Sequence, residues 1–449
     1  MLEGVYWADP ATTGAPSSGA LPPSAPQTPV PPPAGDLDAD LAVIGGGFTG
    51  LATALAVKER FPGRRVVVLE ARACGDGASG RNAGMAMAGC GADLDLLLRR
   101  LGFEGARRNI RLLARGLDRL EALAIRHRFD CAFERTGSLA LARTERQARE
   151  QRRRLEVYRR FGVDAEILGP PALRHTLEAP RFVSGLHVPR TTALVDPWKV
   201  VTGLRRAALA AGVVLHEGTP VLRIQEGTEL RLVTPFGTVR APAAVLATNA
   251  YSSGLGLFRH RVAPVHVSCV VTEPLDAGQR AALGWDLRQS LWEEGRLYHF
   301  LRLTPDNRLL IGGGGAVYRM GDRLDFPGAA KAYARLERAI PEIFPTLHEA
   351  RVTHRWSGPV GFTRDFLPSF GATGERGNIY YAVGYSGHGV ALSHLAAEVL
   401  CDLYAGEQGE CAELFLLNRP LPTLLFEPLK WLAINGVRNG LWVLDRLGL

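Results

Sequence analysis

Short apolar runs divide the chain into predicted strands and helices. The first run, Leu41-Ala42-Val43-Ile44, has no polar position, which is typical of a parallel strand covered on both faces. A glycine-rich turn follows, then a helical segment from about residue 50 to residue 60, and then a second apolar run over residues 66–69. This order predicts a β-α-β unit at the start of the folded chain.

The pattern changes twice further along the chain. Residues 94–128 carry apolar positions at helical spacing and predict two helices, with Asp93 as the cap of the first. Strands dominate between residues 262 and 355, and the strand-then-helix order returns near the C-terminus. Further strands are expected at 138–141, 213–215, 221–224, 245–247, 265–271, 297–303, 309–311 and 379–383, and further helices at 200–211, 331–339 and 390–403. We therefore expect an α/β fold whose nucleotide-binding domain is discontinuous, because the chain leaves that domain and returns to it.

The two ends of the chain differ from its body. Residues 1–37 are expected to form a proline-rich mobile arm, because residues 10–36 have few apolar side chains to bury. Tyr6 and Trp7 are the exception, an aromatic pair expected to dock on this protein or on a partner. Residues 406–449 form a tail with a helix at 428–447. We expect this helix to pack on its own domain and do not favour membrane-surface contact, because its polar residues are sparse and poorly segregated.

Composition and charge exclude several classes of function. The chain has 449 residues, 46% hydrophobic and 22% charged, which is the balance of an ordinary globular protein. Its net charge of +8 reflects an excess of arginine. The basic runs at 107–108 and 152–154 lie in helical segments and are interpreted as solvated helix faces. No aromatic residues are interleaved with basic ones, so nucleic-acid binding is not expected.

The cysteines and the N-terminal residues indicate the expected cellular location. The six cysteines are scattered, with no pair at CxxC spacing, so neither a metal site nor a disulfide framework is expected. The start Met1-Leu2-Glu3 lacks the features of a signal peptide, and no eighteen apolar residues run together. A cytoplasmic location is the expectation.

The turn after the first strand carries a dinucleotide-binding motif. Residues 45–50 (GGGFTG) fit G-x-G-x-x-G, and an acidic residue follows the motif by twenty positions at the end of the next strand. The glycines are expected to form a tight turn, to admit a pyrophosphate to the backbone and to let the helix pack closely on the sheet. The helix N-terminus is expected to bind the phosphates, and the acidic side chain a ribose hydroxyl. The expected cofactor-binding residues here are Gly45, Gly47, Phe48, Thr49, Gly50, Glu70, Ala71 and Arg72.

A second glycine run does not repeat this motif. Gly312 to Gly315 follow a predicted strand, but no helix follows them and no third glycine is in register. These glycines are interpreted as a place where a ring approaches the strand or the sheet bends. With no second nucleotide fold, an enzyme that uses both FAD and NAD is not expected.

The fingerprint is found in proteins that bind FAD and in proteins that bind NAD, so further motifs are needed to choose between these cofactors. These motifs are GASGRNAG at 77–84, RLTPD at 302–306, WSG at 356–358, DFLP at 365–368 and GYSGHGV at 384–390. Together with the fingerprint they resemble the D-amino-acid/glycine oxidase (DAO) superfamily of FAD-dependent oxidoreductases, nearest its gamma-glutamylputrescine oxidoreductase branch. The resemblance runs with breaks from about residue 6 to residue 403.

This resemblance implies two domains and a set of cofactor contacts. It implies a Rossmann-type FAD-binding domain from residues 38–92, 191–260 and 356–405, and an α+β substrate domain on a mostly antiparallel sheet from residues 93–190 and 261–355. It further implies FAD contacts from Ala78, Ser79, Arg81, Asn82, Val221, Ala247, Gly384, Gly387, His388, Gly389 and Val390. Some relatives hold the flavin through a cysteine before the motif at 365–368. Residues 358–363 contain none here, so FAD is expected to bind non-covalently.

The expected function follows from the same resemblance. It is oxidation of the C–N bond of an amine or amino acid by hydride transfer to flavin N5, giving an imine, with oxygen as the expected acceptor. One alternative is a dehydrogenase that passes electrons to a quinone or carrier. Another is a protein that binds FAD without catalysis.

Five residues are candidates for catalysis or substrate binding. They are Tyr298, Arg302, Trp356, Tyr385 and His388. An amine must be neutral to release a hydride, and the three aromatic residues are expected to form walls that favour the free base. Arg302 shares a strand face with Tyr298 and is expected to clamp a substrate carboxylate. His388 precedes a helix whose N-terminus is expected to stabilise negative charge on the flavin pyrimidine. Where many members carry His-Pro this chain has Asp196-Pro197, and no role is assigned to Asp196.

Overall fold

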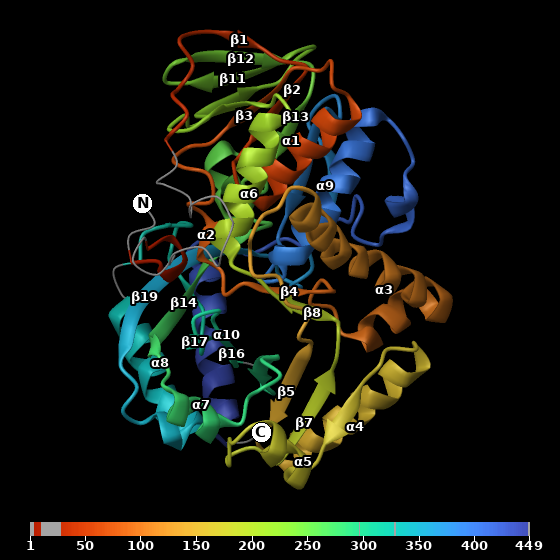
Figure 1. The fold of residues 1–449 in the computed structure, drawn as a ribbon. Helices are drawn as coiled ribbons and strands as arrows, with labels where there is room; N and C mark the ends of the chain where they lie inside the picture. Colours follow the sequence, from red (N-terminus) through yellow and green to blue (C-terminus); the bar gives the residue numbers. More distant parts are fainter. Residues whose placement is uncertain (1–3, 10–27, 296, 327–328, 448–449) are drawn as a thin grey trace.

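The computed structural model describes residues 4–9, 28–295, 297–326 and 329–447, with side chains as far as residue 440. Two lobes share the chain (Figure 1). The first holds a six-stranded sheet in the order β20-β21-β13-β2-β3-β9. The strands are β2 (Leu41–Ile44), β3 (Val66–Leu69), β9 (Val214–His216), β13 (Ala244–Leu246), β20 (Ser369–Thr373) and β21 (Ile379–Val383). All pair in parallel except β20, which is antiparallel to β21. The strands thus come from three separate stretches of chain, which confirms the predicted return of the chain to this sheet.

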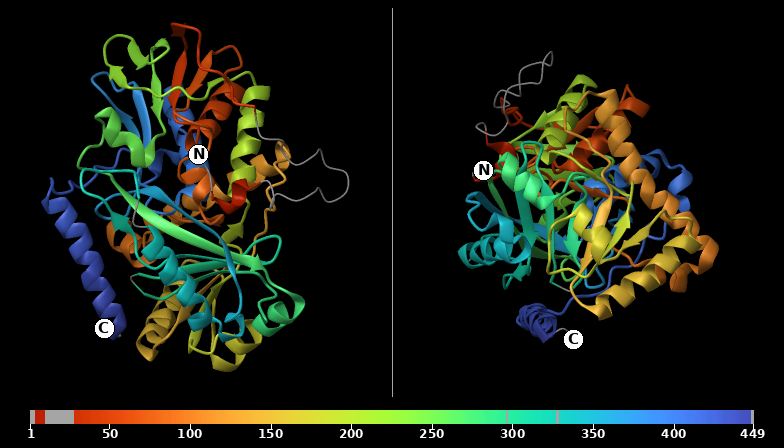
Figure 2. Two further views of the ribbon diagram at one scale, coloured as in Figure 1. Left: turned by 90° about the vertical axis from the view of Figure 1, so that its left-hand side faces the viewer. Right: turned by 60° about the horizontal axis from the view of Figure 1, so that its bottom comes forward.

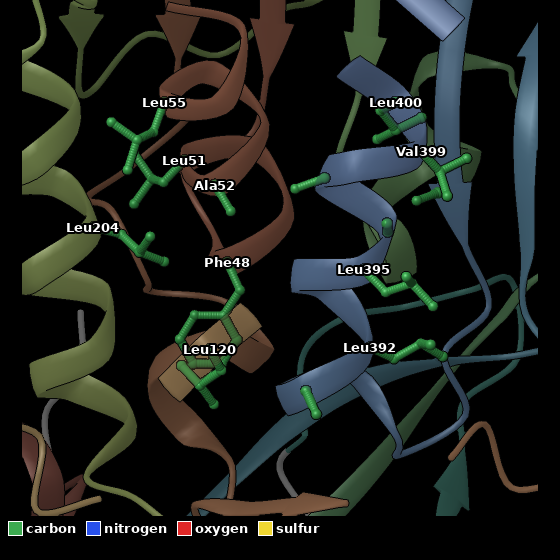
Figure 3. Packing of buried hydrophobic residues seen from close by; sticks show 14 of the residues in the cluster. Phe48, Leu51, Ala52, Leu55, Leu120, Leu204, Leu392, Leu395, Val399 and Leu400 are labelled. Atoms are coloured by element: carbon green, nitrogen blue, oxygen red, sulfur yellow. The ribbon is translucent and has the colours of Figure 1, made fainter. Parts of the chain in front are cut away.

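Helices cover this sheet and form the largest core. They are α1 (Phe48–Arg60), α3 (Leu94–Arg126), α6 (Pro197–Ala210) and α9 (Gly389–Ala405). Leu51 and Leu55 of α1 face Leu204 of α6, and Leu395 of α9 lies across from them (Figure 3). Long α3 bends at Gly102, where φ is +67°, so the two helices predicted for residues 94–128 are confirmed. Asp93 is the N-cap residue, but its side chain makes no capping hydrogen bond.

A small sheet extends the first lobe. Its order is β1-β12-β11-β10, with β1 (Leu37–Asp38), β10 (Arg223–Gln225), β11 (Leu230–Thr234) and β12 (Gly237–Ala241). Strand β1 pairs in parallel with β12. Leu37, the last residue of the expected arm, therefore already belongs to a strand.

The second lobe is built on a nine-stranded, mostly antiparallel sheet. Its strands are β5 (Ser138–Ala142), β6 (Glu166–Leu168), β7 (Ser184–Val188), β14 (Ala263–Pro274), β15 (Ser290–Glu293), β16 (His299–Leu303), β17 (Arg308–Gly313), β18 (Val317–Tyr318) and β19 (Val352–Phe362). Helices α4 (Glu145–Arg160), α5 (Pro170–Thr176), α7 (Ala277–Leu283) and α8 (Ala329–Ile343) pack on it. Strand β19 crosses residue 356, where the resemblance implied a domain boundary, and pairs with β14 over almost its whole length.

The two faces of this sheet have different neighbours. Leu291, Leu301 and Leu303 belong to the core beneath α7 and α8. Trp292 and Phe300, one position out of phase, face the first lobe. This period-two alternation decides which side chains of β15 and β16 can reach the space between the lobes.

Apart from one helix near the C-terminus, the remaining elements are short. They are the 3-10 helices η1 (Tyr6–Ala8), η2 (Asn249–Leu255), η3 (Pro345–Leu347) and η4 (Glu410–Glu413), the one-turn helix α2 (Ala78–Arg81), and the ribbon of β4 (Met85–Met87) and β8 (Thr192–Leu194). Helix α10 (Leu429–Leu447) lies on the outside of the molecule (Figure 2).

Both terminal segments contact the body. In the arm, Tyr6 and Trp7 are buried, and the Val30 N–H donates to Glu217. The expectation of a mobile arm over residues 1–37 is therefore wrong for residues 5–8 and 28–37, while residues 10–27 lie outside the described part. In the tail, Ile434 of α10 packs on the core beside β18, as expected, although Trp431 and Leu432 stay exposed. None of the described helices is long and apolar enough to cross a membrane.

Candidate active site

A cavity of about 1660 Å³ lies between the two lobes. One side is formed by the residues that follow β2, β3 and β13, at the carboxyl ends of the parallel strands. The other side is formed by β14, β16 and β17 of the nine-stranded sheet, and helix α10 contributes part of the rim. Crevices at the carboxyl ends of parallel strands are the usual ligand sites of such sheets.

The glycine motif forms the turn predicted for it. Gly45 has φ +107°, and a Cβ there would lie 2.8 Å from the Ala247 carbonyl oxygen. A Cβ on Gly50 would lie 1.9 Å from the Gly45 carbonyl oxygen, so only glycine lets α1 start this close to the strand. Gly50 therefore shapes the turn without lining the cavity, whereas Gly45, Gly47, Phe48 and Thr49 line it.

Glu70 lies beside this turn at the end of β3. Its carboxylate accepts the Gly46 N–H at 2.6 Å and the Arg72 N–H at 3.0 Å. Burial raises the pKa of Glu70, and these two backbone bonds oppose the rise. Arg72 extends over the ring of Tyr251, 5.6 Å from its centroid, and pairs with Asp76. The carboxylate and this arginine–tyrosine pair form one end of the cavity, where Val221 and Ala247 also lie.

Helix α2 lines the cavity. The Ser79 hydroxyl accepts the Phe48 N–H at 2.9 Å, which ties α2 to the first turn of α1. Asn82 donates to the carbonyls of Ala78 and Ser79 and accepts the Gly84 N–H. Arg81 donates to the Asp76 carboxylate at 3.0 Å. Ala78, Ser79, Arg81 and Asn82 all line the cavity, in agreement with the resemblance.

A second helix begins at the cavity. Gly387, His388, Gly389 and Val390 line it at the N-terminus of α9, and no side chain caps that end. His388 is the N-cap residue, burial lowers its pKa, and its Nδ1 has no hydrogen-bond partner among the described residues. Tyr385 lines the cavity too, with its hydroxyl 2.8 Å from the Thr49 hydroxyl at the start of α1. Gly384 lies behind this wall, where its N–H donates to Asn249.

These features fit FAD. The N-termini of α1 and α9 are positive dipole ends at the cavity, and they would favour an anionic pyrophosphate and an electron-rich pyrimidine ring. Glu70 provides an acceptor for ribose hydroxyls, and the Gly45–Gly47 turn leaves no side chain in the way of the phosphates. The neutral imidazole of His388 and its unused nitrogen lie where the second helix meets the cavity.

The far wall of the cavity is aromatic and apolar. Tyr298, Phe300 and Trp292 line it from the nine-stranded sheet, together with Cys269 and Met85. A Cβ on Gly312 would come 2.4 Å from the Phe300 ring, and Gly313 to Gly315 have positive φ. The interpretation of the second glycine run, a ring that approaches the strand, is confirmed.

The expectation that Arg302 clamps a carboxylate is wrong. Arg302 does share the strand face of Phe300, but its guanidinium is buried and does not line the cavity. It donates to the carbonyls of Ala83 at 3.1 Å, Gly84 at 2.9 Å and Val195 at 2.7 Å. Burial lowers the pKa of Arg302 to about 10, which leaves it charged at neutral pH. Its Nε and Nη1 donors are thus bonded to backbone carbonyls inside the protein.

Trp356 also lies outside the cavity lining. Its indole N–H donates to the Arg81 carbonyl at 2.8 Å, and the ring packs with Trp7 and Cys269 in one core. Trp356 therefore supports α2 from behind. Of the five catalytic candidates, the cavity brings together Tyr298, Tyr385 and His388.

Several lining residues were missed from the sequence. Asn249 and Tyr251 follow β13 on a 3-10 helix, and Trp292 precedes a loop. Phe300 had a usable signal, since it alternates in phase with Tyr298. Arg154, interpreted as part of a solvated helix face, turns inward and pairs with Glu294 at 2.9 Å.

Asp196 has a structural role. It caps α6, accepting the Lys199 N–H at 3.0 Å, and it is buried. Burial raises its pKa to about 6, with the Lys199 N–H and the nearby charges of Lys199 and Arg302 opposing the rise. This residue belongs to the scaffold behind the cavity, since it is absent from the described lining.

Known proteins resemble this chain over most of its length. The chain is 32% identical over 385 residues to gamma-glutamylputrescine oxidoreductase of Escherichia coli (strain K12), covering 82% of this chain and 84% of the relative. It is 27% identical over 373 residues to glycine oxidase of Geobacillus kaustophilus (strain HTA426), covering 81% and 92%.

Solved structures agree in fold. The crystal structure of glycine oxidase from Geobacillus kaustophilus superposes with a TM-score of 0.69 at 26% identity, over 86% of this chain and 100% of that one. L-Proline dehydrogenase from P. horikoshii superposes with a TM-score of 0.70 at 22% identity, over 84% and 96%, which speaks for the fold alone. A family model described as FAD dependent oxidoreductase (DAO) matches residues 40–403. The chain belongs to this DAO family of FAD-dependent oxidoreductases, and FAD is its cofactor.

Proposed function

We propose that this chain, an FAD-dependent oxidoreductase of amines or amino acids, oxidises an amine that carries no carboxylate on the reacting carbon. The observation that carries the proposal is the aromatic wall of Trp292, Tyr298 and Phe300, combined with the loss of Arg302 as a clamp. An imine forms when a hydride leaves the carbon bonded to nitrogen, and FAD supplies the acceptor for that hydride.

Two cations of the cavity lining are already paired with acids, which supports a substrate without that carboxylate. Arg81 is paired with Asp76, and Arg154 with Glu294. A carboxylate next to the aromatic wall would have to compete with these acids. Aromatic and apolar walls disfavour an ammonium relative to the neutral amine, and only the neutral amine has a lone pair to support the departing hydride.

The protein's own residues then have defined tasks. Tyr298 and Phe300 orient the amine and exclude water from it. His388 stays neutral, because burial lowers its pKa, and its place at the start of α9 lets the helix N-terminus face developing negative charge.

A substrate with a carboxylate remote from the reacting carbon is the second candidate, and one residue favours it. Arg438 of α10 lines the rim of the cavity, and its hydrogen bonds go to Asn439, with no acid among its partners in the described residues. A carboxylate at the far end of a longer substrate would reach it.

A matched pair of substrates tests the proposal. Anaerobic bleaching of the flavin is measured with a primary amine and with the amino acid that differs only by a carboxylate on the reacting carbon. The amine should reduce the flavin faster, and Phe300→Leu should slow that reduction while leaving FAD content unchanged. Faster reduction by the amino acid overturns the proposal.

The electron acceptor and the location are proposed separately. We take oxygen as the acceptor, with a quinone or carrier protein as the alternative, and hydrogen peroxide release distinguishes them. The six free, buried cysteines support a reducing cytoplasm as the location.

A further inference from the structure

The N-terminal segment Val5 to Asp9, here called the strap, lies against the back of helix α2. Val5, Tyr6 and Trp7 are 1%, 4% and 2% exposed, which is the burial of core residues rather than of a chain end. They pack in one core with Ala83 and Met85 of the cofactor lobe and with Val271, Leu310 and Trp356 of the nine-stranded sheet. The strap thus touches both lobes that enclose the cavity.

Trp7 makes two contacts at the end of α2. Its indole N–H donates to the Asn82 carbonyl at 2.9 Å, and its ring lies 5.3 Å from the Arg302 guanidinium carbon. Arg302 in turn holds the next two carbonyls, those of Ala83 and Gly84. Trp356 holds the preceding one, that of Arg81. Four consecutive carbonyls, from residue 81 to residue 84, are therefore fixed from behind by two indoles and one guanidinium.

The front of the same segment faces the cavity. Ser79, Arg81 and Asn82 line it, and the Ser79 hydroxyl accepts the first N–H of α1. The turn leaves no room to adjust, because a Cβ on Gly84 would lie 2.1 Å from the Val195 carbonyl oxygen and 2.4 Å from Arg302. A shift of Trp7 must therefore be passed on to the residues that contact FAD.

The other end of the strap is fastened to the nine-stranded sheet. The Tyr6 hydroxyl donates to the Asp306 carboxylate, which also accepts from Arg308 at 2.6 Å. Asp9 pairs with His354 of β19 at 2.9 Å. These bonds tie the strap to β17 and β19 and their connecting loops, while Trp7 reaches the cofactor lobe.

We propose that the strap positions the FAD-contacting segment 78–84 against the substrate-side sheet, with Trp7 as a positioning residue for the bound flavin. Trp7 is not part of the described cavity lining and acts through the Asn82 carbonyl and through Arg302. A chain end that lies outside the family-model match at residues 40–403 is thereby part of the cofactor site.

The test compares substitutions of Trp7 with a substitution of a second, equally buried tryptophan. Trp7→Leu removes both contacts. It should raise the Kd for FAD about tenfold, because one buried hydrogen bond and one cation–π contact are lost. It should also change the visible circular dichroism of the bound flavin. Trp7→Phe keeps a ring over Arg302 but has no N–H, so it should show a smaller change in the same two measurements.

Trp285→Leu is the control. Trp285 is equally buried and also donates its indole N–H to a carbonyl, that of Gln289, but it lies in the core beneath α7 and α8. It should lower the Tm and leave the Kd and the flavin spectrum unchanged. If Trp7→Leu behaves like Trp285→Leu, the strap is only structural and the proposal is overturned. If Trp7→Leu does not fold, an unchanged Kd and spectrum in Trp7→Phe overturn it equally.

Discussion

The indole of Trp7 covers the guanidinium of Arg302, two residues separated by almost 300 positions in sequence. The carbonyls of Ala83, Gly84 and Val195 hold the same guanidinium through Nη1. Arg302 therefore lies outside the described cavity lining, although it shares a strand face with Phe300, and its contact with Trp7 connects the N-terminal segment to the cofactor segment.

Arg302→Leu should destabilise the protein and lower its FAD content. The change removes the Arg302 donor from the carbonyls of Ala83 and Val195, whereas Gly84 keeps the Val195 N–H, and we expect a cost of about 3 kcal/mol. Thermal unfolding and the ratio of flavin to protein absorbance measure both effects. A stable variant with full FAD content and a raised KM for carboxylate-bearing substrates alone would restore Arg302 as a substrate ligand.

Glu70→Ala should weaken FAD binding by about ten- to a hundred-fold. The substitution removes a charge-assisted acceptor for a ribose hydroxyl, worth about 1.5–3 kcal/mol. It also frees the Gly46 and Arg72 N–H groups that now organise the turn. Titration of the apoprotein with FAD measures the affinity, and an unchanged Kd would show that Glu70 serves the turn alone.

FAD should leave the protein on acid precipitation, since residues 358–363 contain no cysteine. Flavin in the supernatant is the expected result. Cys269 is the cysteine that lines the described cavity. If flavin stays in the pellet, the non-covalent assignment is wrong, and Cys269→Ser shows whether this thiol holds it.

His394 should make the protein less stable in acid. It is buried in α9, its Nδ1 is bonded to the Val390 carbonyl, and burial lowers its pKa from 6.5 to about 4. Between these values the unfolded chain binds a proton that the folded one does not, so stability falls as the pH falls from 6.5 towards 4. The loss from this residue reaches about 3 kcal/mol.

The variant His394→Phe isolates that contribution. It keeps a ring of similar size near Phe48 but has no proton to bind. Urea unfolding at pH 7 and pH 4.5 should show a smaller difference for the variant than for the parent protein. Equal differences in the two proteins would mean that other groups cause the loss of stability in acid.

The sequence by itself determined the elements whose causes are local. In the fingerprint at residues 45–50, glycine stands where the tight turn and the closely packed helix leave no room for a Cβ. The apolar runs at 41–44 and 66–69 specify buried parallel strands. The resemblance to the family led to residues 78, 79, 81, 82 and 387–390, which line the cavity in two contiguous sets at helix N-termini.

Only the tertiary structure decided which candidates reach the cavity. The period-two alternation of a strand correctly placed Tyr298, Phe300 and Arg302 on one face. The groups that contact Arg302 on that face belong to Trp7, to residues 83–84 and to Val195, and no local pattern links these positions. A guanidinium is stable in a buried site wherever enough carbonyls converge on it, and that convergence is a property of packing. For the same reason Tyr298 became a cavity wall, while Arg302 and Trp356 became the support behind α2.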